Sequence, residues 1–178
     1  MDVYVEVGKT RTFASAVAWP GWGRSGRDEP AALEALLDSA ARYARALRGT
    51  RLGFRPPTAL RVVERLTGNA TTDFGAPDVA SSSDGSPIAD PELRRLGSIL
   101  RASWRTFDAA VDSASGTTLR TGPRGGGRDV DKIVEHVQGS EASYLTMIGG
   151  KRWVPRYFVR RVAWHVLDHA WEIEDRTE

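Results

Sequence analysis

The chain has 178 residues, which is room for one ordinary domain or two small ones and enough mass to bury a core. A composition of 40 % hydrophobic and 27 % charged residues is typical of a soluble globular protein, and a net charge of +2 with acidic residues throughout predicts no nucleic-acid partner. The absence of cysteine excludes disulfides, thiolate metal sites and a cysteine nucleophile. No apolar run approaches about 18 residues and the N-terminus lacks a signal-peptide pattern, so we expect a cytoplasmic protein without a membrane partner.

Residues 1–67 predict a small α+β layer. Alternating apolar residues predict strands over 2–8 and 12–19, and the spacing of leucine and alanine predicts a helix over 30–48. The apolar run at 60–66 follows two prolines and predicts a third strand. The expected order is therefore β-β-α-β.

This order resembles the HicB-like domain over residues 2–66. The resemblance rests on Trp19-Pro20-Gly21 at the end of the second strand and on the pattern SG-x-x-x-x-AAL, which opens the helix. It implies a partner-binding module, which in that family often belongs to an antitoxin. A generic α+β layer that serves as a scaffold explains the same residues.

The remainder of the chain predicts a linker and a helical bundle. Residues 68–91 are rich in Gly, Ala, Ser, Asp and Pro without periodicity, which is typical of a linker or loop. Apolar residues at helical spacing predict helices over 92–115, 128–148 and 154–176. We therefore expect an α+β protein in which the sheet layer is followed by a helical bundle over 92–178.

All three histidines fall on the apolar stripes of predicted helices. His165 and His169 are four residues apart and so share one face of the last helix, while His136 lies on the helix before it. Three imidazoles from two neighbouring helices can bind one divalent cation and leave a coordination position open for water or a substrate. The alternative is that they are core residues, hydrogen-bonded to Asp168, Glu172 or backbone carbonyls, with no metal.

The two histidine-bearing helices, with the patterns DKIVEHVxGxExxYL and RRVAWHVLDHAWEIEDR, resemble the DinB-like superfamily of metal-binding four-helix bundles over residues 92–178. The resemblance implies that His136, His165 and His169 bind zinc, nickel or a similar divalent metal. Some members of that superfamily are thiol S-transferases or mycothiol-dependent isomerases. The resemblance therefore also implies a small-molecule substrate and a low-molecular-weight thiol as cofactor. Because the chain lacks cysteine, any thiolate must come from such a cofactor.

The predicted bundle departs from that superfamily in one place. The superfamily has a helix between its first histidine helix and its last one, whereas here only Gly149 to Trp153 intervene. Either the helix at 30–48 fills this place, or a second protomer does, or residues are missing between Gly149 and Arg152. Three apolar stripes without a fourth helix would leave apolar surface exposed, so we expect a homodimer or the use of the 30–48 helix.

Three further residues are candidates for roles around the metal. Glu172 lies one turn beyond the histidine pair, so we expect it to orient a histidine or to act as a general base. The glycine-rich loop 122–127 leads into a helix, and Arg124 and Arg128 beside it are candidates for binding an anionic cofactor. A flexible turn is the simpler explanation of the same loop.

Two functions follow from these observations. The first is a divalent-metal-binding protein of the DinB-like kind, acting as a metal-dependent S-transferase or isomerase together with a thiol. The alternative is a non-enzymatic HicB-like module that binds a partner, with the bundle as its scaffold. The metal content of untagged protein separates the two, because only the first requires an ion.

Overall fold

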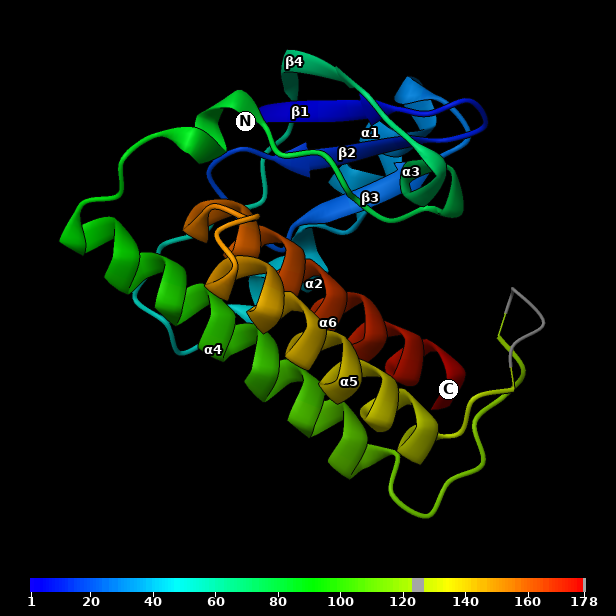
Figure 1. Cartoon of the computed structure of the whole chain (residues 1–178). Coiled ribbons are helices and arrows are strands. Elements are labelled where there is room, and N and C mark those ends of the chain that lie inside the picture. Colours follow the sequence, from blue (N-terminus) through cyan, green and yellow to red (C-terminus); the bar gives the residue numbers. More distant parts are fainter. Residues whose placement is uncertain (123–126, 178) are drawn as a thin grey trace.

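The computed structural model describes residues 1–122 and 127–177 of the chain. Within them the protein is of the α+β class, with a four-stranded sheet packed against a bundle of long helices (Figure 1). The strands are β1 (Asp2–Val7), β2 (Thr12–Ala16), β3 (Gly23–Gly26) and β4 (Arg61–Thr67). The helices are α1 (Glu29–Asp38), α2 (Ala40–Ala46), α3 (Ala70–Phe74), the 3-10 helix η1 (Ser82–Gly85), α4 (Asp90–Ser113), α5 (Val130–Gly149) and α6 (Pro155–Thr177).

The sheet has the order β3-β2-β1-β4, with β1 antiparallel to β2 and parallel to β4. On one face, Val3 and Val5 of β1 lie opposite Ala16 and Ala14 of β2, and all four residues belong to the main core cluster. Helix α1 packs against β2 and β3. The parallel pairing of β1 with β4 needs a long crossover, which β2, β3, α1 and α2 together supply.

The opposite face of β1 is buried as well, which the alternating pattern alone did not predict. It carries Tyr4 and Glu6, both fully buried. The guanidinium carbon of Arg160 on α6 lies 5.3 Å from the Tyr4 ring centroid, and Thr72 on α3 donates a hydrogen bond to Glu6 at 3.2 Å. The start of α6 and the segment after β4 therefore cover this face of the sheet.

The structure contains one strand that the sequence did not predict. Strand β3 has the sequence GRSG, which lacks apolar alternation, and it joins the sheet through backbone pairing with β2. Strand β2 ends at Ala16 and not at Trp19, because the chain turns there and the Trp22 N–H donates to the Trp19 carbonyl at 3.1 Å. The observed order is thus β-β-β-α-α-β in place of the expected β-β-α-β.

The predicted helix over 30–48 is two helices, which meet at Ser39. The Ser39 hydroxyl donates to the Leu36 carbonyl at 2.8 Å, and the indole N–H of Trp22 donates to the same carbonyl at 3.0 Å. These side chains take the acceptor that a continuous helix would offer to the next turn. A buried tertiary contact with Trp22 therefore accompanies the break, and the apolar spacing of the helix does not reveal it.

Residues 68–91 were expected to form a linker or loop, and they hold two short helices. Asn69 caps α3 by accepting from the Thr71 N–H at 2.8 Å, and Ser81 caps η1. Asp84 of η1 is 1 % exposed and forms an ion pair with Arg160 at 2.8 Å. The polar residues that favour a loop are used here as helix caps and as partners for a buried arginine, so this segment packs against α6.

The three long helices end within two residues of their predicted bounds, and α4 and α5 both pack against α6. Helix α2 contacts α4, so the second half of the 30–48 segment lies beside the bundle (Figure 1). The chain is continuous through the turn after α5, where the Gly150 N–H donates to the Thr146 carbonyl at 2.9 Å and Lys151 has a φ of 55°. No gap in the chain therefore separates Gly149 from Arg152.

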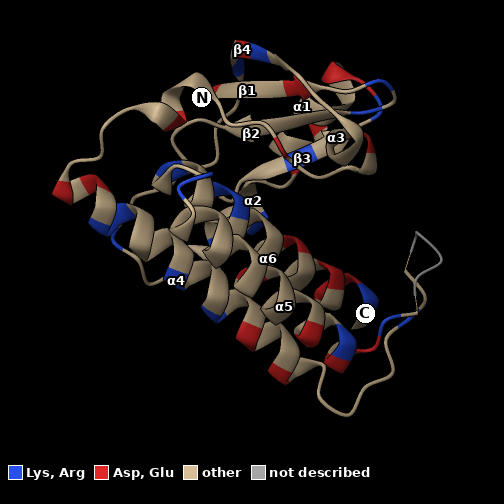
Figure 2. Ribbon diagram, in the orientation of Figure 1, with Lys and Arg blue, Asp and Glu red and all other residues tan. Residues whose placement is uncertain are grey.

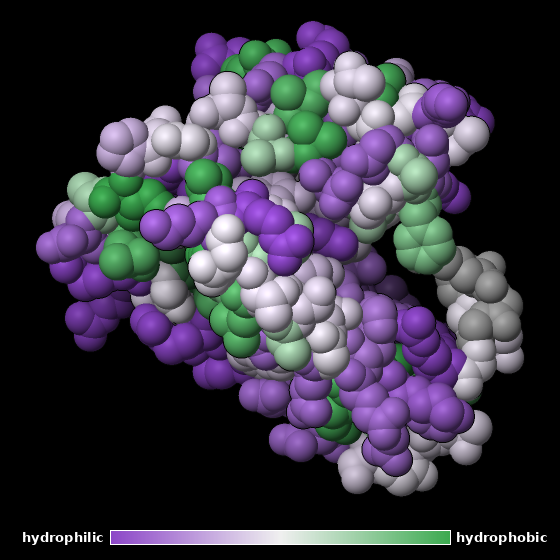
Figure 3. Space-filling model, in the orientation of Figure 1, coloured by the Kyte–Doolittle hydropathy of each residue, from purple (hydrophilic) through white to green (hydrophobic). Residues whose placement is uncertain are grey.

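Charged residues of both signs are distributed over the long helices, around α2 and over the sheet layer (Figure 2). In the same orientation the surface is largely hydrophilic, with small apolar areas between the charged ones (Figure 3). Within the described ranges, no helix combines the length and the apolar character that crossing a membrane requires.

Candidate metal site

Helix α6 is the most deeply buried of the long helices, because its small and apolar residues are distributed over several faces. Val162, Ala163, Val166, Leu167 and Ala170 are each at most 1 % exposed. A helix that is apolar on several faces must be covered on several sides, and here α4, α5 and the sheet layer cover it. The face of α6 that carries its two histidines lies towards α5, which carries the third.

The three histidines form one cluster. The ring centroids are 5.2 Å apart for His136 and His165, 4.9 Å for His136 and His169, and 4.6 Å for His165 and His169. One ring nitrogen of each residue can be chosen so that the three nitrogens all lie within 4.8 Å of one another. The structure thus brings together the three residues that the sequence selected as metal ligands.

Glu172 fixes the orientation of one of these rings. Its Oε2 atom lies 2.8 Å from Nδ1 of His169, and its Oε1 atom accepts from Nη1 of Arg176 at 2.8 Å. The hydrogen bond from His169 holds the pKa of Glu172 below its usual value, and Arg176 contributes in the same direction. An ionised carboxylate only accepts, so Nδ1 of His169 carries a proton, and in the neutral form of this ring Nε2 is the nitrogen with a free lone pair.

The other two rings are held neutral by their surroundings. Burial, together with the neighbouring His169 and Arg161, lowers the pKa of His165 to about 2, and burial is the main cause. Burial is also the main cause of the lowered pKa of His136. Neutral imidazole is the form that binds a metal, so the cluster is prepared for coordination at neutral pH.

The spacing of the ring nitrogens fits a shared ion. Nε2 of His136 and Nε2 of His165 are 3.3 Å apart. Two nitrogen ligands at about 2.0–2.1 Å from a tetrahedral zinc ion are separated by roughly 3.3 Å. Without an ion, two neutral imidazoles at this distance can share one proton, in which case one ring donates to the other. The donor set of three neutral nitrogens suits zinc or nickel better than calcium or magnesium, which prefer oxygen ligands.

The predicted anion site at the start of α5 stays a prediction. Arg124 lies outside the described residues. Arg128 is exposed, and its carbonyl accepts from Nη2 of Arg176 at 2.7 Å. The carboxylate of Asp129 caps the helix by accepting from the Lys132 N–H at 2.9 Å. This acidic cap already occupies a backbone amide that an anionic cofactor would use, and its negative charge would repel the cofactor.

Asp168 and Trp171 point away from the cluster, whereas the ring of Trp164 lies 6.3 Å from that of His165 between centroids. Asp168 lies 3.2 Å from Arg24 on β3, so it is not the partner of a histidine. Trp164 packs edge-on against Phe13 at 5.4 Å between centroids. The guanidinium of Arg24 lies 3.9 Å from the centroid of Trp171. The contacts of Asp168 and Trp171 with Arg24 could not be predicted from the sequence, because strand β3 was not predicted.

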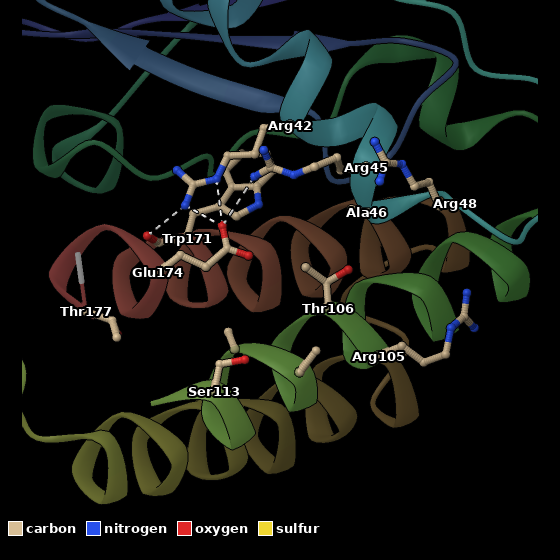
Figure 4. A pocket seen from close by; sticks show the side chains of 12 residues that line it. Arg42, Arg45, Ala46, Arg48, Arg105, Thr106, Ser113, Trp171, Glu174 and Thr177 are labelled. Atoms are coloured by element: carbon tan, nitrogen blue, oxygen red, sulfur yellow. Dashed lines mark hydrogen bonds and ion pairs between the residues drawn. The ribbon is translucent and has the colours of Figure 1, made fainter. Parts of the chain in front are cut away.

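A groove of about 490 Å³ lies on the side of α6 opposite the histidines, between α2 and α4. Arg42 and Glu174 point towards one another across it, 2.6 Å apart, whereas Arg48 and Arg105 lie at its other end (Figure 4). A second groove of about 430 Å³ shares Arg48 and Arg105. Neither groove is lined by a histidine, so the histidine cluster lies outside both of them.

Comparisons of the chain with protein-family models, with curated proteins and with solved structures give no match.

Proposed function

We propose that this chain binds one divalent transition metal, zinc or nickel, through His136, His165 and His169. The metal would act in a transferase or isomerase reaction on a small molecule, together with a low-molecular-weight thiol. The proposal includes the fold: a HicB-like layer followed by a DinB-like helical bundle. The observation that carries it is the convergence of three buried or half-buried imidazoles, the only histidines of the chain, at distances that suit one ion.

The chemistry of the donor set supports an open site over a closed one. A three-histidine ion with a free position acts as a Lewis acid and lowers the pKa of a bound water or thiol. The protein's own residues hold the site: burial keeps His136 and His165 neutral, and Glu172 presents Nε2 of His169 to the cluster. His136 is only half-buried, so the cluster is reached from the α5 side.

Glu172 suits the role of positioning residue better than that of general base. Both of its oxygens are engaged, one by His169 and one by Arg176, and its pKa is lowered. A carboxylate in this state gives up its partners only at a cost and accepts a proton poorly. The pairing of a carboxylate with the outer nitrogen of a metal-binding histidine fixes the ring and raises its basicity.

The test is the metal content of protein purified without an affinity tag and then dialysed against zinc. We expect about one ion per chain by elemental analysis, and a higher melting temperature with the ion than without it, since a ligand that binds only the folded state stabilises it. His165→Ala and His169→Ala should each lose the ion while far-UV circular dichroism stays unchanged, because the apolar contacts of α6 remain.

Asp168→Asn is the matched control. This residue lies between the two histidines in sequence but faces Arg24, so the variant should keep one ion per chain. Wild-type protein that takes up no zinc and is fully stable without it would contradict the proposal. The partner-binding alternative, with the bundle as scaffold, would then be the better description.

A further inference from the structure

Four arginines of α6 are almost completely buried, and three of them have a carboxylate partner. Arg156 pairs with Glu92, Arg160 with Asp84 and Arg176 with Glu172, each at 2.8 Å. Each of the three also donates to backbone carbonyls. The fourth is Arg161, which is 9 % exposed and is the exception.

Arg161 has no anionic partner among the described residues. Its Nε and Nη1 atoms are buried and make no hydrogen bond. Its guanidinium carbon lies 5.2 Å from the ring centroid of Tyr144 and 5.0 Å from that of Trp164. Burial raises the pKa of Tyr144 and a side-chain hydrogen bond with Arg161 acts against this larger effect, so the remaining polar partner of the guanidinium is a neutral hydroxyl. Aromatic faces attract a cation, but they do not replace the hydrogen bonds that a buried guanidinium loses on leaving water.

Two further hydrogen-bond donors that have no acceptor among the described residues lie beside Arg161. The hydroxyl of Tyr157, one turn earlier on α6, and the indole N–H of Trp164 are also buried without a partner. Burial raises the pKa of Tyr157, so this hydroxyl keeps its proton and remains a donor. A cation and two neutral donors therefore lie on adjacent turns of one helix, and an acceptor with a single negative charge would satisfy them.

This donor cluster adjoins the histidines. Arg161 precedes His165 by one helical turn, which is roughly 6 Å along the axis. The ring of Tyr144 contacts both of them: its centroid lies 5.6 Å from that of the His165 ring and 5.2 Å from the guanidinium carbon of Arg161. A small molecule of a few bonds in length therefore spans the distance between Arg161 and the histidine cluster.

We propose that Arg161, with the hydroxyl of Tyr157 and the indole N–H of Trp164, binds the carboxylate of a small-molecule substrate whose other end reaches the metal site. A carboxylate matches the single positive charge, whereas a phosphate dianion would need a second unpaired cation. The other cation nearby, Arg160, is already paired with Asp84. This inference names the class of the substrate. Only the contact of the substrate with the metal rests on the proposed function; the carboxylate site does not.

The first test is the stability of the metal-free protein in a chloride buffer. Arg161→Met should melt at the same temperature as wild type or higher, because it removes a buried charge that has no partner. Arg160→Met is the matched control on the same helix. It leaves the buried carboxylate of Asp84 without a counter-charge and should lower the melting temperature by about 10 °C. Arg161→Gln serves as a second uncharged variant if methionine disturbs the packing.

The second test adds succinate at constant ionic strength. Succinate should raise the melting temperature of metal-free wild type and should not raise that of Arg161→Met, because a ligand of the folded state stabilises it. An equal shift in both proteins, or no shift in wild type, overturns the carboxylate site. The comparison needs no metal, so it stands even if the histidines fail to bind zinc.

The third test asks whether one molecule reaches both ends. Zinc-loaded wild type should bind succinate about 10-fold more tightly than the metal-free protein in calorimetry, since one ligand then makes two attachments. Arg161→Met should still bind one zinc ion per chain but lose this gain. Equal affinity with and without zinc overturns the link between the two ends while leaving both sites intact.

Discussion

The residues that distinguish this protein are its buried polar side chains. Arg160 and Asp84 are almost fully buried and satisfy one another, whereas Glu6 is fully buried with only one of its oxygens bonded. Oε2 of Glu6 accepts from Thr72 at 3.2 Å and from the Asp78 N–H at 2.9 Å, but Oε1 has no hydrogen-bond partner within the described part of the chain. Burial raises the pKa of Glu6 to about 7, while the hydrogen bonds to it act in the opposite direction.

The raised pKa of Glu6 predicts a loss of stability as the pH rises. The unfolded value is 4.5 and the folded value is about 7, so the folded state holds the proton more tightly. The stabilisation is fully present below pH 4.5 and is lost as the pH passes through 7. Glu6→Gln should therefore gain on the order of 3 kcal/mol relative to wild type between pH 4.5 and pH 8. Urea unfolding at several pH values measures this difference, and parallel curves for the two proteins would show that Glu6 does not titrate as expected.

Among the elements, α6 organises the molecule because it touches both the sheet layer and the other long helices. Its close approach to the turn after β2 depends on Gly21, which has a φ of 90°. A Cβ atom added there would lie 2.9 Å from Cβ of Ala163 and 3.3 Å from Cδ1 of Leu167. Glycine is thus needed both for the backbone conformation and for the packing of α6 against the turn.

Gly21→Ala should lower the free energy of unfolding by about 2–4 kcal/mol, since left-handed strain and overlap with α6 add together. Gly49→Ala is the control, because Gly49 has a φ of 76° and no atom within 4 Å of the added Cβ. That variant should lose only about 1 kcal/mol from strain. Chemical denaturation of both proteins gives the values, and equal losses would mean that the contact with Ala163 contributes nothing.

At the scale of the whole molecule, the sheet layer and the helices share one core. The main cluster of buried apolar residues joins Val5 of β1 and Leu36 of α1 to Ile99 of α4, Ile133 of α5 and Val166 of α6. The ion pair of Asp84 with Arg160 adds a buried polar connection between the segment after β4 and α6. The large apolar side chains that are exposed, such as Val63, Leu93 and Leu145, are scattered over different elements. The expected homodimer stays a prediction.

A shared core predicts that the sheet layer and the bundle unfold together. Tryptophan fluorescence and far-UV circular dichroism should give coincident urea transitions with one midpoint. If the sheet layer unfolded alone, the apolar face of the bundle that it covers would be exposed to water, and the reverse also holds. Two separated transitions would instead indicate that residues 1–67 and 92–178 fold independently. Sedimentation of the same samples tells whether the cooperative unit is one chain or two.

The local pattern of the sequence was enough to predict the long helices, three of the strands and the three histidines as one set. Periodic apolar spacing fixes which face of a helix is buried, and i and i+4 spacing places His165 beside His169 on that face. His136 could be predicted as the third member of the set, because it lies on the apolar stripe of the preceding helix. These features depend on neighbours in the sequence, so they can be read without the fold.

The remaining features depend on contacts between residues far apart in the chain. Strand β3 forms because β2 offers an edge, the break at Ser39 accompanies a contact with Trp22, and Asp84 is buried because Arg160 needs a counter-charge. The same holds for Arg161, whose lack of a carboxylate partner among the described residues appears only when every neighbouring side chain is in place. The energies of buried ion pairs and of strand pairing depend on which residues are neighbours in space. The periodicity of the local sequence carries no information about these neighbours.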